Sequence, residues 1–181
     1  MQKEINNAIA VLKQGGIILY PTDTIWGIGC DATNPYAIAK IYKLKNRADS
    51  KALISLVSDK TQLKNIVQTV PEIDITTKPT TIIYAKPKEL SNNLLAENGS
   101  AAIRIVQDEF CQNLIQQLGN AIVSTSANIS GNEEPKKFSE ISGEIKDKVD
   151  YIVNLRQNEL MSTPSTILLI NEDNSITKIR E

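Results

Sequence analysis

Residues Tyr20–Asp31, with the sequence YPTDTIWGIGCD, decide the fold of this chain. They follow a short apolar run, Ile17–Leu19, which predicts a buried strand. Pro21 fixes its own φ angle and holds Tyr20 in an extended conformation, while the two glycines of the stretch allow close backbone approach. The stretch is therefore a strand that ends in a small polar loop. That loop is either a capped turn without a ligand or one wall of a binding site.

Apolar strands and amphipathic helices alternate along the rest of the chain. The expected helices are Gln2–Lys13, Asn34–Lys45 with Asn34 as the cap, Ser58 or Asp59 to Thr69, Pro87–Leu95, Glu109–Leu118 and a weaker one over Phe138–Lys148. The expected strands are Ile17–Tyr20, Leu53–Val57, Thr80–Ala85, Ala101–Val106, Ala121–Ser124 and Tyr151–Leu155, followed by a hairpin of Thr166–Ile170 and Ile176–Ile179. This order predicts an α/β fold with a mixed parallel and antiparallel sheet and flanking helices, and the length of 181 residues predicts one domain over 1–181.

The composition excludes several classes of chemistry. The chain has no histidine, so no Ser-His-Asp triad and no histidine metal site is possible. Cys30 and Cys111 lie far apart and form no C-x-x-C motif, and the chain shows neither a secretory pattern nor an apolar run of about 20 residues. We therefore expect a cytoplasmic protein without a membrane partner. An enzyme of this composition would work mainly by positioning and charge.

Basic residues gather after the helix that begins at Asn34. Lys45 and Arg47 lie two residues apart where that helix should end, so that both side chains can converge on one anion, and Lys51 follows. The net charge of the chain is only −1, so this clustering is local. For Lys40 and Lys43 the better interpretation is a pair of solvated residues that the helix dipole favours.

Short polar side chains follow the strand that begins at Ala121. Ser124, Ser126 and Asn128 belong to the string STSANISG, at the carboxyl end of a strand, where open α/β sheets bind ligands. Each of these residues alone is also compatible with an ordinary polar loop. The chain contains no P-loop and no complete G-x-G-x-x-G motif, so any nucleotide would be held in another way.

Arginine inside an apolar strand is a further signal. Arg104 interrupts AAIRIV, and such a charge needs a partner or a ligand unless the strand is at an edge. Ser165, which precedes a strand, and Arg180, near the end of the chain, are weak signals alone. Asp23 either orients its loop or reaches a metal ion, and the sequence does not distinguish the two.

Taken in order, the motifs PTDTIWGIGCDA, IYKLKNR, AAIRI, STSANISG, PSTI and a closing IR resemble the YrdC-domain family, the threonylcarbamoyl-AMP synthases, in their short bacterial form. The resemblance covers nearly the whole chain. It implies a twisted mixed sheet with a concave basic face. It also implies a reaction in which L-threonine, bicarbonate and ATP, with Mg²⁺ carried on the ATP, give threonylcarbamoyl-AMP and pyrophosphate. That product feeds the N6-threonylcarbamoyladenosine modification of tRNA, so tRNA and the downstream threonylcarbamoyl-transfer proteins are expected partners.

The resemblance also implies roles for individual residues. The signature residues of the family fall on Lys45, Arg47, Ser126 and Asn128, of which the first two are the expected catalytic pair. The expected threonine-binding residues are Thr24, Arg104, Ser124 and Ser165 with its neighbour Thr166. The expected nucleotide-binding residues are Arg47, Lys51, Ser126, Asn128 and Arg180. The resemblance implies no metal site on the protein itself.

The chain departs from the family pattern at several positions. Ala48 stands where proline is frequent, Lys51-Ala52 replaces an Asn-Pro or Lys-Pro pair, Leu56 stands where some branches have histidine, and Lys78–Thr81 replaces P-G-P-x-T. These differences motivate an alternative, a paralogous RNA-binding module without synthase activity. A further alternative is a carbamoyl-adenylate enzyme like the YrdC-like modules of hydrogenase-maturation proteins, although the zinc-finger and acylphosphatase segments found there are absent.

Overall fold

The computed structural model describes residues 1–46, 53–75, 77–171 and 175–180. Its helices are α1 (Gln2–Lys13), α2 (Pro35–Leu44), α3 (Lys60–Ile66), α4 (Glu109–Leu118) and α5 (Gly143–Lys148), with 3₁₀ turns η1 (Asn92–Leu94) and η2 (Phe138–Glu140). Its strands are β1 (Ile18–Tyr20), β2 (Gly27–Gly29), β3 (Ile54–Val57), β4 (Thr80–Ala85), β5 (Ser100–Ile105), β6 (Ile122–Ser126), β7 (Tyr151–Ile152), β8 (Thr166–Ile170) and β9 (Ile176–Arg180).

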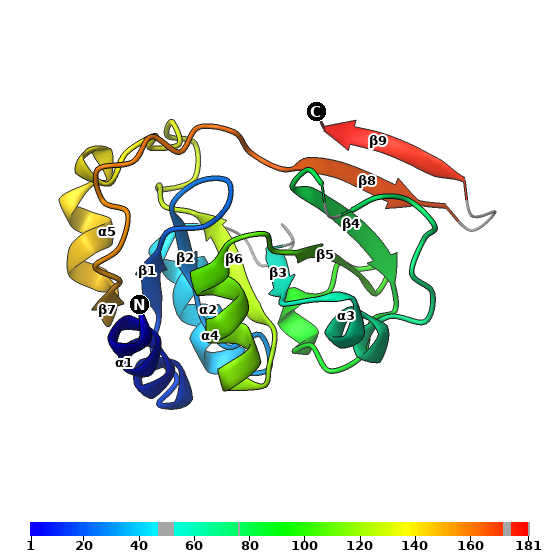
Figure 1. Cartoon of the computed structure of the whole chain (residues 1–181), viewed down its shortest axis with the longest axis horizontal. Helices are drawn as coiled ribbons and strands as arrows, with labels where there is room; N and C mark the ends of the chain where they lie inside the picture. Colours follow the sequence, from blue (N-terminus) through cyan, green and yellow to red (C-terminus); the bar gives the residue numbers. More distant parts are fainter. Residues whose placement is uncertain (47–52, 76, 172–174, 181) are drawn as a thin grey trace.

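The described strands form one nine-stranded sheet in the order β7-β1-β2-β6-β3-β5-β4-β8-β9. The pairs β1–β7, β3–β5 and β4–β8 are parallel and the others are antiparallel. In Figure 1, α1 and α4 lie on the near side of the sheet and α2 lies behind it, while the β8–β9 hairpin extends toward the C-terminus. The predicted α/β fold with a mixed sheet is confirmed. Among the described residues, no helix is long and apolar enough to span a membrane.

Local sequence signals explain where the helices begin. The Asn34 side chain accepts hydrogen bonds from the backbone amides of Tyr36 and Ala37, and Pro35 occupies the first turn of α2, as predicted. Asp59 and Asp108 cap α3 and α4 in the same way. Each cap accepts hydrogen bonds from amides only two or three residues further along the chain. The starts of these helices could therefore be predicted from the local sequence.

The structure differs from the sequence prediction mainly at segment ends. Helix α3 ends at Ile66 rather than Thr69 because Val67 turns to an extended conformation, and the helix expected over Pro87–Leu95 is only the turn η1. The weak helix over Phe138–Lys148 is split, with Ser142 capping α5. The glycine-containing loop is partly a strand, β2, and β6 continues two residues beyond Ser124.

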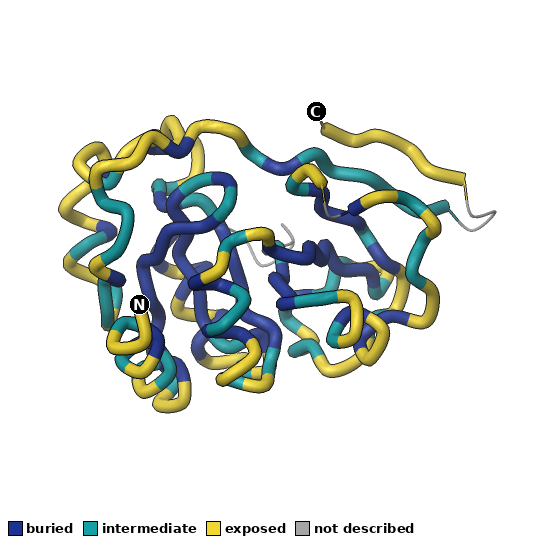
Figure 2. Tube along the Cα trace, in the orientation of Figure 1, coloured by how far each residue is buried: buried dark blue, intermediate teal, exposed yellow. Residues whose placement is uncertain are grey.

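Tertiary packing makes β2 a strand despite its glycines. The Tyr20 ring on β1 lies across β2, and its hydroxyl donates to the Val123 carbonyl of β6 at 3.0 Å. A Cβ on Gly29 would lie 2.2 Å from that carbonyl oxygen and 2.7 Å from the Tyr20 ring. Gly29 is therefore required by close approach, as the sequence predicted, and the strands around it form the buried centre of the molecule in Figure 2.

We expect Gly29→Ala to lower the free energy of unfolding by about 2 kcal/mol or more, because the added methyl group overlaps backbone atoms that cannot move easily. The matched control is Gly143→Ala, where nothing lies within 4 Å of the added Cβ, and a change within about 0.5 kcal/mol is expected. Urea denaturation of the three proteins measures both values. Equal stability of the two variants would contradict the packing argument.

Candidate functional site

The loop between β1 and β2 is held in one conformation by hydrogen bonds from several elements. Thr22 Oγ1 accepts from the backbone amide of Thr24 at 3.0 Å and lies 2.8 Å from the Ile25 carbonyl, to which it donates. The carbonyl of Thr22 accepts from Arg156 Nη1 at 3.1 Å, and the Pro21 carbonyl accepts from the Cys111 thiol at 3.3 Å. The loop is therefore a preformed wall and not a free turn.

Arg104 projects from β5 toward this loop. The strand lies between β3 and β4, so it is central and not an edge strand, and Arg104 is only 3% exposed. Its Nη1 donates to Asp23 Oδ1 at 2.5 Å and its Nη2 donates to Thr24 Oγ1 at 3.3 Å. Its Nε has no partner among the described residues. A charge inside an apolar strand was expected to have a partner or a ligand, and Asp23 is that partner.

Two segments distant in sequence meet beside Arg104. Thr81 on β4 is the cross-strand partner of Arg104, and its hydroxyl lies 2.8 Å from the Ser165 hydroxyl. The Ser165 carbonyl accepts from Arg180 Nη2 at 2.9 Å. The strand pairing of Arg104 with Thr81 thus links the Arg104–Thr24 contact to Ser165 and Arg180, although the last two were weak signals in the sequence.

Lys45, Ser126 and Asn128 form a second group. Lys45 is 2% exposed, and its Nζ donates to the Ser126 carbonyl at 2.5 Å, the Asn128 carbonyl at 2.8 Å and Asn128 Oδ1 at 3.0 Å. Ser126 Oγ donates to the same Oδ1 at 2.7 Å. The ammonium group therefore ties the end of α2 to the loop after β6, and its positive charge is held among oxygen acceptors.

The sheet register places the two groups on one face. Arg104 on β5 is aligned with Leu56 on β3, which is aligned with Ile122 on β6. Aligned residues of neighbouring strands share a face, and residues two apart on one strand do so too, so Ser124 and Ser126 lie on the same side as Arg104. Ser124 stands between the groups. The fold and this face together define an α/β protein with buried polar and charged side chains grouped on one side of its sheet, which is the candidate site.

Several predicted residues lie outside the described part of the chain. They are Arg47, Lys51, Ala48 and Ala52. Their placement relative to the two groups is not described, and their roles stay predictions. Thr81 and Arg156 were not predicted as site residues, and the role of Asp23 was left open between orienting its loop and reaching a metal ion. Arg156 follows a predicted strand and has the unusual φ of 53°, but nothing in its local sequence points to the distant Thr22 carbonyl.

The two cysteines are buried within the core. Burial raises the pKa of both the Cys30 and the Cys111 thiols well above their ordinary value. Both therefore stay protonated at neutral pH, and neither is an activated nucleophile. Among the described residues, no group of three or more His, Cys, Asp or Glu side chains is arranged to hold a metal ion.

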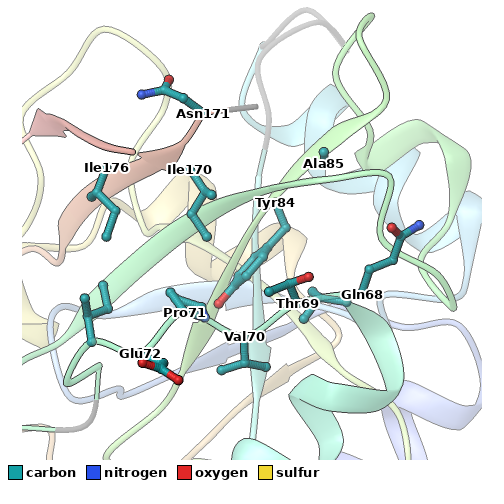
Figure 3. A pocket seen from close by; sticks show the side chains of 12 residues that line it. Gln68, Thr69, Val70, Pro71, Glu72, Tyr84, Ala85, Ile170, Asn171 and Ile176 are labelled. Atoms are coloured by element: carbon teal, nitrogen blue, oxygen red, sulfur yellow. The ribbon is translucent and has the colours of Figure 1, made fainter. Parts of the chain in front are cut away.

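The structure also contains a cavity of about 670 Å³ (Figure 3). It is lined by residues 67–73, by Tyr84 and Ala85 at the end of β4, and by Ile170, Asn171 and Ile176 of the terminal hairpin. None of the predicted site residues that the structure describes lines it. Tyr84 is 4% exposed, its hydroxyl has no partner among the described residues, and burial raises its pKa.

Comparison with known proteins identifies the family. A family model described as "Telomere recombination", for Sua5, YciO and YrdC, matches residues 10–181. A threonylcarbamoyl-AMP synthase of Idiomarina loihiensis is 33% identical over 147 residues, which are 77% of this chain and 79% of that protein. One of Blochmanniella pennsylvanica is 31% identical over 162 residues, or 85% and 81% of the two chains. The chain belongs to the Sua5/YciO/YrdC family, which confirms the resemblance found in the sequence.

Solved structures show the same fold. Sua5 of P. abyssi, in its complex with L-threonine, superposes with a TM-score of 0.86 at 22% identity, and the match covers 99% of this chain and 54% of that one. E. coli YciO superposes with a TM-score of 0.84 at 24% identity over 100% and 90% of the two chains. This chain thus spans about half the length of P. abyssi Sua5 and most of the length of YciO.

We expect Lys45→Met to lower the free energy of unfolding by about 2 kcal/mol, because the three hydrogen bonds from the buried ammonium group to the loop after β6 are lost. Lys43→Met is the matched control at the same helix end, where the side chain is exposed, and its effect should stay within about 0.5 kcal/mol. Chemical denaturation distinguishes the two. A loss of similar size in both variants would show that the contacts of Lys45 add no stability.

We expect Tyr84→Phe to be neutral or to raise the free energy of unfolding by up to about 1 kcal/mol, since the buried hydroxyl has no partner among the described residues. The matched control is Tyr20→Phe, which removes a buried hydrogen bond to Val123 and should destabilise the protein by about 1 kcal/mol. Thermal denaturation gives the order of the three proteins. A destabilised Tyr84→Phe would reveal a hydrogen bond that this arrangement lacks.

Proposed function

We propose that this protein is a threonylcarbamoyl-AMP synthase, which converts L-threonine, bicarbonate and ATP to threonylcarbamoyl-AMP and pyrophosphate. The observation that carries the proposal is the shared face of β5 and β6. There a buried arginine beside a threonine hydroxyl lies on the same side of the sheet as the Lys45–Ser126–Asn128 group. The names of the relatives at 31–33% identity support it.

The group around Arg104 suits an amino acid that carries a hydroxyl. In this proposal Arg104 attracts the carboxylate of threonine, while the hydroxyls of Thr24, Ser124 and Ser165 recognise its polar atoms. These side chains are buried or nearly so, which strengthens their electrostatic interactions. The group around Ser126 and Asn128 would hold ATP, together with Arg180, Arg47 and Lys51.

The chemistry needs no nucleophilic side chain of the protein. The threonine nitrogen bonds to the carbon of bicarbonate and water leaves, which gives a carbamate. A carbamate oxygen then attacks the α-phosphorus of ATP, the bond from that phosphorus to the pyrophosphate oxygen breaks, and pyrophosphate leaves with its electron pair. The protein brings two anionic reactants together and stabilises the charge that develops on the phosphate. Lysine, arginine, hydroxyl and amide groups are sufficient for this, so a chain without histidine can perform it.

Mg²⁺ would enter with ATP, bound mainly by the triphosphate oxygens. The product would pass to the threonylcarbamoyl-transfer proteins that modify tRNA, and the activity would then be cytoplasmic. Within the group after β6, Lys45 would act by fixing Asn128 and Ser126, since its Nζ already donates to their oxygens.

The test is a pyrophosphate-release assay with the purified chain. We expect release only when L-threonine, bicarbonate, ATP and Mg²⁺ are all present, and we expect ATP and threonine together to raise the melting temperature by more than the sum of their separate effects, because they share one site. Release without threonine, or none with all substrates, would refute the proposal. Binding of tRNA with a steep salt dependence, and no binding of ATP or threonine, would instead favour the RNA-binding module.

A further inference from the structure

Asp23 is the one charged side chain that the loop between β1 and β2 presents to Arg104. Its side chain is 8% exposed, and its two oxygens have different partners. Oδ1 accepts from Arg104 Nη1 at 2.5 Å, and Oδ2 accepts from the backbone amide of Gln107 at 2.9 Å. The carboxylate therefore joins the loop both to the arginine and to the backbone just beyond the end of β5.

This arrangement requires a carboxylate. Both partners of Asp23 are donors, so the side chain must accept at both oxygens. An asparagine can accept only at one position and would turn its NH₂ group toward the other donor. A buried guanidinium also needs a negative charge nearby, because an unpaired charge in the interior is strongly disfavoured.

The guanidinium is held at two points by adjacent residues. Asp23 holds Nη1 and Thr24 holds Nη2, so a shift of the loop moves both contacts together. The loop is itself fixed by the Thr22 hydroxyl and by Arg156, which pairs in turn with Asp108 at the start of α4. The orientation of Arg104 is thus set by a chain of contacts that ends at Asp23.

We propose that Asp23 is a positioning residue for threonine recognition: it holds the Arg104 guanidinium in the orientation that receives the substrate carboxylate. The inference rests on the proposed function. It gives Asp23 a role in substrate binding and assigns it no contact with a metal ion or with the reacting atoms. Two adjacent residues of the loop between β1 and β2 therefore serve threonine binding. Thr24 contacts the substrate directly, and Asp23 acts through Arg104.

The test separates the two substrates. In Asp23→Asn we expect the KM for threonine to rise by about tenfold or more, while the KM for ATP changes by less than about twofold. Substitution of a residue that only stabilises the fold would change the KM for threonine and the KM for ATP together. Asp147→Asn, an exposed acid on α5, is the matched control and should leave both constants unchanged.

A double-mutant cycle tests the route through Arg104. We expect Asp23→Asn to lower kcat/KM for threonine by less than about twofold in the Arg104→Lys background, since the group that it positions is already altered. If Asp23→Asn does not fold, Asp23→Glu keeps the charge, displaces it by one methylene group and should show the same selective rise in the KM for threonine.

Two results would overturn the inference while the proposed function stands. One is a parallel rise in the KM values of threonine and ATP, and the other is full additivity in the cycle. Failure of the proposed function is detected separately, because the unmodified protein would then release no pyrophosphate with threonine, bicarbonate and ATP. That result would refute both the proposed function and the role of Asp23.

Discussion

A positive charge in the middle of a sheet is the constraint on which the rest of this structure depends. Arg104 lies on β5 between two other strands and is almost fully buried, and such a charge persists only with a counter-charge and hydrogen-bond acceptors close by. The loop between β1 and β2 supplies them through Asp23 and Thr24. In the sheet, β6 and β3 lie between β2 and β5, so the loop has to reach across both strands to contact Arg104. This requires close packing of β1, β2 and β6, and it requires the loop to keep one conformation.

The glycines of β2 meet the first of these requirements. With no side chain at Gly29, the Tyr20 ring packs directly on the strand and its hydroxyl reaches the Val123 carbonyl of β6. Hydrogen bonds from the Thr22 hydroxyl and from Arg156 meet the second requirement. A polar site inside a sheet is thus supported by close backbone packing on one side and by a rigid loop on the other.

Much of this could be predicted from local sequence. Helix starts follow from caps such as Asn34, the strands follow from apolar runs, and the family follows from the motifs around Thr24 and Ser126. Segment ends were less predictable, because the Ile66 carbonyl at the end of α3 accepts from the distant Lys88 amide, and β2 is a strand through its pairing with β1 and β6. Lys45 was predicted to meet an anion and to be one of the catalytic pair, and those roles stay predictions. Its three contacts with the loop after β6 were not foreseen, since they join residues about 80 positions apart.

The amino-acid sequence by itself determined the class of fold, the family and the kinds of group available for chemistry: hydroxyls, amides and cations, without histidine. These properties depend on residue types, spacing and short-range propensities, which the sequence states directly. Only the tertiary structure decided that Arg104 is central and not at an edge, that Asp23 is its counter-charge, and that Ser165, which contacts Arg180, meets Thr81 on the neighbouring strand. Strand order and register bring these residues together, and both result from packing between segments far apart in the chain.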